Sequence, residues 1–196
     1  MRLHVVIFLV GLLSVVQQGR AEDGTALPKA REALTRLKAE CDVPGQTNAS
    51  LWTAYVSATE KARHEAITQL KSLGGETVAE VRHELERADG EHKEMLTITL
   101  AALGDDKAVT QASELMLHSK RAAVRVCAAW ELQGLKDKRT LEYFKQALHD
   151  PYERKDGSCV PIGDGMIHPV RVIASDALVG LGVPFEEVRK LRGDAR

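Results

Sequence analysis

Aromatic residues are scarce in this chain. Phe, Trp and Tyr together make up 4% of its 196 residues, whereas Ala and Leu are plentiful. Strands favour aromatic and β-branched side chains, while Ala and Leu are strong helix formers and suit close helix–helix packing. The composition therefore predicts an all-α fold, in a chain long enough to bury a core within one domain.

The chain also lacks an excess of basic charge. It has 27 Lys and Arg against 28 Asp and Glu. Without residues 1–21, which we expect to be removed, 25 basic residues remain against 28 acidic ones, a net charge near −3. Proteins that bind nucleic acid present a strongly basic face. We therefore expect no nucleic-acid partner.

Cysteine is present in an odd number, so at least one thiol has no intramolecular disulfide partner. The three are Cys41, Cys127 and Cys159. Cys127 stands among apolar residues and is predicted to be a small buried side chain. Cys41 and Cys159 are far apart in a linear stack of repeats, and a disulfide needs Cα atoms within about 7 Å. We do not expect them to pair.

The one long apolar run lies near the N-terminus. Arg2 and His4 stand at its start, residues 5–16 are apolar, and Gly19 and Ala21 are the small residues of a cleavage site. This layout is typical of a secretory signal peptide, and the run is shorter than the ~20 apolar residues of a membrane helix. Residues 1–21 therefore predict a secreted or periplasmic protein. The alternative is an uncleaved anchor, which would be its only contact with a membrane.

Four segments share one pattern. They begin at Arg63, Lys93, Arg125 and Arg171, and each closes eleven positions later with Gly or, once, with Lys136. Four positions before the close stand Leu70, Leu100, Leu132 and Leu178, and one position before it stand Leu73, Leu103, Leu135 and Leu181. Self-similar helices at steps of 30, 32 and 46 residues predict a solenoid of stacked helix pairs.

Start and stop signals place the helices around this pattern. We expect them over residues 26–40, 50–73, 77–88, 91–103, 106–118, 121–135, 139–149, 169–181 and 184–191. The second half of the helix over 50–73 is expected to form the first repeat with the helix over 77–88. Residues 22–50 are then an N-terminal helix and hinge, and residues 51–196 are the repeat domain.

Residues 123–152 and 168–183 resemble HEAT-like repeats of the short bacterial type, which phycobilin lyases share. The resemblance lies in a Val-Arg pair, an Ala-rich helix ending in Leu and a second helix ending before Asp150. It extends over residues 60–192. It implies a right-handed α-solenoid of about four helix-pair repeats with an N-terminal helical extension. It also implies a groove that binds a partner protein or peptide.

One catalytic branch of the family, deoxyhypusine hydroxylase, holds two irons with His-Glu pairs at the starts of successive repeat helices. Here only His64-Glu65 stands in that register, and the equivalent pairs are Glu94-Met95, Val126-Cys127 and Val172-Ile173. Two irons need several converging ligands. We expect no catalytic residue, no metal and no cofactor, and we expect His64 to be a polar surface residue.

The basic residue that opens each repeat helix has two interpretations. It can hydrogen-bond an acidic group or a carbonyl in the adjoining turn, repeat after repeat. It can also belong to a basic stripe that binds a partner. We favour the structural interpretation.

An insertion over residues 150–168 lengthens the last step of the repeat. Pro151, Pro161 and Pro169 and three glycines exclude a helix there, and long loops in compact domains are often functional. We interpret the insertion as a partner-recognition loop at one edge of the solenoid. The candidate partner-binding residues are Tyr152, Arg154, Lys155 and Met166.

The sequence thus favours an exported, non-catalytic interaction scaffold, for which a small-molecule ligand is not expected. Two alternatives stay open. One is metal or thiol chemistry at the insertion. Asp156 and Asp164 could bind calcium, or Cys159 could bind zinc together with His149 and His168. Cys159 could also act as a nucleophile with His168 as its base. The other alternative is a self-associating structural protein of the envelope.

Overall fold

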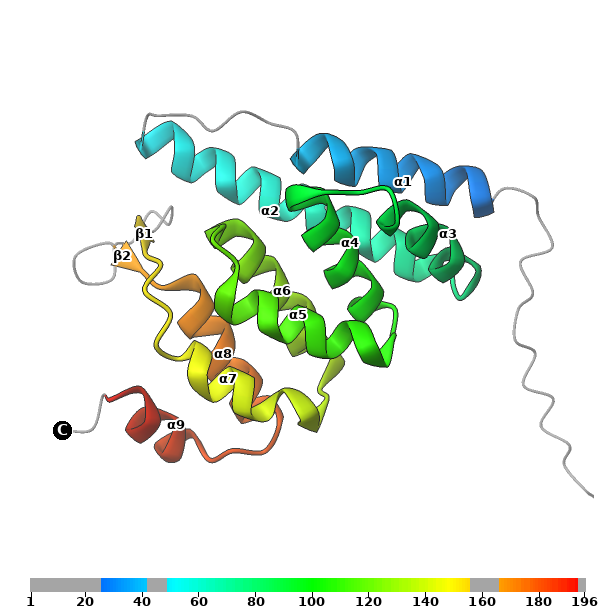
Figure 1. Ribbon diagram of the computed structural model, residues 1–196. Helices are drawn as coiled ribbons and strands as arrows, with labels where there is room; N and C mark the ends of the chain where they lie inside the picture. Colours follow the sequence, from blue (N-terminus) through cyan, green and yellow to red (C-terminus); the bar gives the residue numbers. More distant parts are fainter. Residues whose placement is uncertain (1–25, 42–48, 156–165, 194–196) are drawn as a thin grey trace, which may run out of the picture.

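The structure is a computed structural model and describes residues 26–41, 49–155 and 166–193 (Figure 1). In chain order, its elements are α1 (Ala26–Cys41), α2 (Ala49–Ser72), α3 (Glu76–Leu85), α4 (Gly90–Ala102), α5 (Asp106–His118), α6 (Ala122–Leu135), the short 3-10 helix η1 (Lys138–Thr140), α7 (Leu141–Ala147), β1 (Arg154–Lys155), β2 (Met166–Ile167), α8 (Pro169–Gly180) and α9 (Phe185–Arg192).

The predicted all-α fold is confirmed for the described residues. Only β1 and β2 interrupt it there, as a ribbon of two residues in each strand. Most helix limits lie within one or two residues of the predicted ones, and α5 coincides with the predicted range 106–118. The predicted helix over 139–149 is instead a turn of 3-10 helix followed by the seven residues of α7.

The helices α4, α6 and α8 pack side by side, with α5 against α4 and α6, and α7 against α8 and α5 (Figure 1). The helix α3 packs against α4, and α9 packs against α8. The repeated leucines explain this arrangement, because Leu70, Leu100, Leu132 and Leu178 are all buried. Ala66, Leu96, Ala128 and Ala174, at one shared position of the repeat, are fully buried as well. Burial of one leucine contributes about 1.5–3 kcal/mol.

The residue that closes each repeat helix has left-handed backbone geometry. The φ angles are 80° at Gly74, 88° at Gly104, 94° at Gly182 and 52° at Lys136. Glycine adopts this conformation without a steric penalty, whereas a Cβ atom makes it unfavourable. Lys136 is the one non-glycine residue of positive φ in the described part of the chain. The repeat therefore imposes its turn geometry even where the sequence departs from glycine.

The N-terminal helices differ from the expectation. The second half of α2 was expected to stack on α4 as the first repeat helix, yet α2 packs mainly against α1 and α6, and α1 contacts α2, α3 and α4. The reason lies in α4, whose residues from Met95 to Ala102 are all buried. Eight consecutive buried residues lie on all sides of a helix, so this part of α4 must be covered by several neighbouring elements. The helices α1 and α2 help to supply that cover.

Lys136 offers a test of the shared turn geometry. Changing Lys136 to Gly should raise the free energy of unfolding by about 0.5–1 kcal/mol, because relief of the left-handed strain exceeds the extra entropy of the unfolded chain. Urea unfolding followed by circular dichroism measures it. The matched control Lys136→Ala removes the side chain but keeps Cβ, and should give no gain. Equal gains in the two variants would contradict the strain argument.

Candidate functional site

The insertion over residues 150–168 is anchored by a β-ribbon. The strands β1 and β2 pair antiparallel, with Arg154 opposite Ile167 and Lys155 opposite Met166. The backbone of three predicted binding residues, Arg154, Lys155 and Met166, therefore lies in the stem of the ribbon. Their side chains and residues 156–165 lie outside the described part of the structure. The ribbon stands at one side of the helical stack, just before the first turn of α8 (Figure 1).

Tyr152, the fourth predicted binding residue, has a different position from the one expected. It is only half exposed and packs against the hydrophobic core. Its backbone carbonyl lies 3.1 Å from Nδ1 of His168. Tyr152 therefore helps to fix the base of the insertion instead of standing free at its tip.

Asp150 organises the base of the insertion. Its carboxylate accepts hydrogen bonds from Arg125 Nε at 2.6 Å and Nη2 at 3.3 Å, and from the backbone N–H of Tyr152 at 2.9 Å. Its carbonyl accepts a bond of 2.6 Å from Nε of Arg171. The side chain of Asp150 is 4% exposed and that of Arg125 is 12% exposed. One residue thus ties α6, α8 and the ribbon together.

These bonds decide between the two interpretations of the basic residues. Arg125 and Arg171 bind the turn after α7, and Arg63 is buried and forms an ion pair of 2.6 Å with Glu91. The structural interpretation is confirmed for these three arginines. Lys93 differs, because its side chain is exposed and no ion pair joins it to any described residue.

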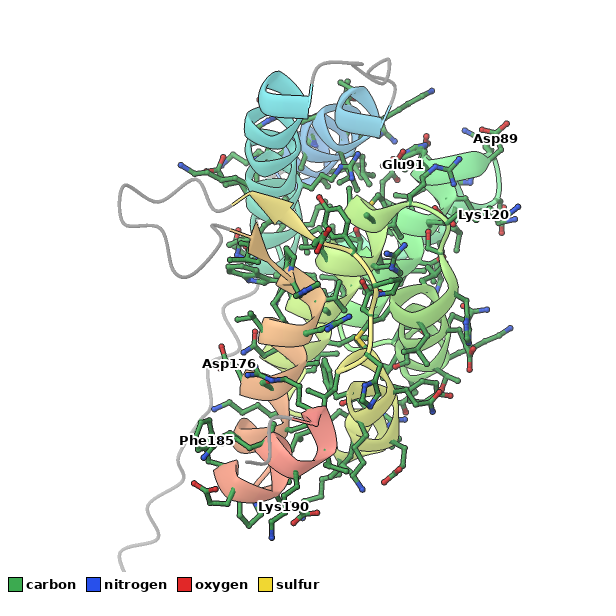
Figure 2. All side chains as sticks on the ribbon, turned by 90° about the vertical axis from the view of Figure 1, so that its left-hand side faces the viewer. Asp89, Glu91, Lys120, Asp176, Phe185 and Lys190 are labelled. Atoms are coloured by element: carbon green, nitrogen blue, oxygen red, sulfur yellow. The ribbon has the colours of Figure 1, made fainter. Side chains whose placement is uncertain are left out.

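An exposed apolar surface lies on α6 and α8 beside the insertion. Val172 and Val179 are 47% and 45% exposed, and they stand at helical spacing on either side of the exposed Asp176. Trp130 of α6 occupies the same position in the repeat as Asp176 and is 51% exposed. Figure 2 shows Asp176 and Phe185 on the same side of the molecule, and Phe185 is 62% exposed. We call Trp130, Val172 and Val179 the apolar face.

The helix α2 borders this face through a polar contact. Nδ1 of His64 lies 2.6 Å from Oε1 of Glu131, and Nζ of Lys71 lies 3.7 Å from Oε2 of the same carboxylate. Glu131 is 2% exposed. The His64 ring also lies 5.6 Å from the ring of Trp130. We expected His64 to be only a polar surface residue. Instead its contacts with Glu131 and Trp130 link α2 to α6 at the edge of the apolar face.

Sequence reasoning missed the apolar face, although a signal for it was present. The tryptophan at position 130 stands where the next repeat has Asp176, so a large apolar side chain occupies a position that is charged in the next repeat. The sequence also contained a signal for the contact between α2 and α6. Glu131 stands among apolar residues, at the position where the next repeat has Ala177. A buried carboxylate needs a basic partner from another helix.

The residues proposed for metal or thiol chemistry are only partly described. Asp156, Cys159 and Asp164 lie outside the described residues. His149 is exposed, and His168 lies at the base of the ribbon. Within the described part of the chain, no group of three or more His, Cys, Asp or Glu side chains is placed to hold a metal ion. Cys127 is buried, as predicted.

Removing the carboxylate of Asp150 tests its anchoring role. Asp150→Ala should lower the free energy of unfolding by about 2–4 kcal/mol, because it leaves Arg125 buried without its acid. It should also speed proteolytic cleavage between residues 150 and 168. The matched control is Asp176→Ala, which removes an exposed aspartate from α8 and should change stability by no more than about 0.5 kcal/mol. Equal losses in both variants would rule out the anchoring role.

Comparison of the chain with protein-family models, with curated proteins and with solved structures finds no match. The HEAT-like resemblance thus rests on the repeat residues themselves. In the described ranges, no helix combines the length and the apolar character needed to cross a membrane.

Proposed function

We propose that this chain is an exported, HEAT-like α-solenoid that acts as a non-catalytic scaffold and binds another protein or a peptide. The observation that carries the proposal is the apolar face, where Trp130, Val172 and Val179 are each about half exposed on two neighbouring helices. Single exposed apolar side chains are common, but a cluster on one surface is typical of an interaction site.

The chemistry of the apolar face suits a protein partner. Tryptophan is enriched among the residues that dominate binding energy at interfaces, because it buries a large area at a small entropic cost. Trp130 is held beside His64, so its ring is partly positioned before a partner arrives. Asp176 stands between the two valines and could receive a basic side chain of the partner.

The insertion extends this surface in the proposal. Val172 lies in the first turn of α8, directly after β2, so the ribbon borders one end of the apolar face. Arg154, Lys155 and Met166 would then contact the edge of a partner bound across α6 and α8. The Asp150 bonds hold the ribbon at a fixed place on the stack and support this role.

The solenoid arrangement is supported by the packing of α4 on α6 and of α6 on α8, by their buried leucines Leu100, Leu132 and Leu178, and by the left-handed residue that closes each repeat. A right-handed stack of this kind would be covered at its N-terminal end by α1 and α2 and at its C-terminal end by α9. The short helix α9 suits the end of a stack, since it buries Val188 and otherwise presents mostly charged residues.

The apolar face is tested by partner capture from the exported fraction of the source cells. We expect Trp130→Ala to weaken capture roughly thirtyfold, as loss of a central tryptophan costs about 2 kcal/mol at an interface. Val179→Ala should weaken it less. The control is Leu27→Ala, which removes an equally exposed apolar side chain from α1. Unchanged capture by the Trp130 variant would refute the proposed site.

Light scattering over a concentration series separates a scaffold from a self-associating envelope protein. Association of the wild-type chain with itself, abolished by Trp130→Ala, would assign the apolar face to copies of this chain instead of another protein.

Export is tested separately. The purified natural protein should begin at Glu22, because cleavage is predicted after Ala21. Mass spectrometry of the intact chain from the secreted or envelope fraction measures this. A chain that retains residues 1–21 would support the uncleaved anchor.

A further inference from the structure

A second surface, distinct from the apolar face, is an open groove of about 660 Å³ between α4 and α5. It is lined by the N-terminal half of α4, the C-terminal half of α5 and the turn that enters α6. Figure 2 shows Lys120, which lines this groove, on the side of the molecule opposite Asp176. The groove is therefore a separate candidate binding surface.

Both carboxylates on the wall of the groove already have partners. Glu94 accepts bonds from Arg121 Nη1 at 3.0 Å and from the Ser119 hydroxyl at 3.2 Å. Glu114 lies 3.4 Å from Nε2 of His118. Glu114 also hydrogen-bonds the hydroxyl of Tyr143, and this bond raises the pKa of Tyr143. The acidic groups of the wall are thus largely satisfied from within the chain.

The basic groups of the groove are not balanced in the same way. Arg121 is held by Glu94 and by Glu91, at 3.3 Å. Lys93 and Lys120 are exposed, line the groove and form no ion pair with any described residue. The lining of the groove therefore holds three permanent cations, Lys93, Lys120 and Arg121, against two carboxylates, Glu94 and Glu114. The groove is locally basic in a chain whose net charge is −1.

The floor of the groove gives it a second property. Leu115 is half-buried there, and the hydroxyl of Thr97 donates a 3.0 Å bond to the carbonyl of Lys93 within α4. The floor thus offers the apolar surface of Leu115 and the Thr97 hydroxyl, which already donates its hydrogen within α4 and can only accept a bond from a ligand. A matching ligand would combine an apolar side chain for the floor with carboxylates for the two lysines.

We infer that the α4–α5 groove binds an acidic peptide segment of a partner protein, in which carboxylates flank an apolar residue. Lys93 and Lys120 bind the carboxylates and Leu115 contacts the apolar side chain. This assignment explains why the side chain of Lys93 alone, among the four basic residues that open the repeat helices, forms no bond to the described part of the chain. It does not depend on the apolar face of α6 and α8.

The test uses a fluorescein-labelled, glutamate-rich peptide with a central leucine, and fluorescence anisotropy with residues 22–196. We expect the peptide to bind and its affinity to fall steeply between about 0.05 and 0.5 M NaCl, because exposed charges are screened. Lys93→Glu combined with Lys120→Glu should weaken binding by at least about tenfold. The same peptide with glutamine in place of every glutamate should not bind.

The matched control is Lys190→Glu combined with Lys138→Glu, which reverses two exposed lysines outside the groove. Lys190 lies on α9, at the far end of the molecule from Lys120 (Figure 2). The control should bind the peptide about as well as the wild-type chain does. No binding by the wild-type chain, equal binding of the glutamine peptide, or an equal loss in the control would overturn the assignment. Trp130→Ala should leave this binding unchanged, which separates it from the proposed scaffold function.

Discussion

The buried ion pair between Arg125 and Asp150 holds together the part of the molecule that carries the proposed binding surface. The pair fixes the turn after α7 to α6, and the carbonyl of the same aspartate receives Arg171 from α8. The α6–α8 spacing and the place of the inserted ribbon therefore share one anchor. Arg63 and Glu91 form a comparable bond near the start of the stack. Such pairs are costly to desolvate, and truncating one partner leaves the other charge buried and unpaired.

The packing of α1 and α2 on α4 determines which surface is left for a partner. Because the residues of α4 from Met95 to Ala102 are all buried, α1 and α2 pack against it, and α2 also reaches α6 through His64 and Glu131. Ile98 is fully buried, whereas Trp130 and Asp176, at the same repeat position, are exposed. The surface left open on this side is therefore the one on α6 and α8, beside the ribbon. The groove between α4 and α5 lies elsewhere, so the two proposed surfaces could be occupied together.

Some features of the candidate sites could be predicted from the sequence, and others could not. The structural role of Arg63, Arg125 and Arg171 was predicted from their shared position at the start of the repeat helices. Lys93, at the same position, forms no ion pair with any described residue. Tyr152 was expected in an exposed loop and is packed against the core. The pairing of His64 with Glu131 joins residues 67 positions apart. No local pattern predicts a contact of that kind, since it depends on where α2 crosses the stack.

The sequence by itself determined the helical class, most helix limits and one buried leucine column, that of Leu70, Leu100, Leu132 and Leu178, because these follow from side-chain periodicity within single helices. The second predicted column, Leu73, Leu103, Leu135 and Leu181, is only partly buried. The sequence also determined the left-handed turns at three glycines. Tertiary structure alone decided that α2 packs across to α6, that Asp150 joins two arginines, and that Lys93 faces a groove with no acidic partner among the described residues. These features depend on which helix faces are covered by distant segments, and the sequence of a single helix does not specify those neighbours.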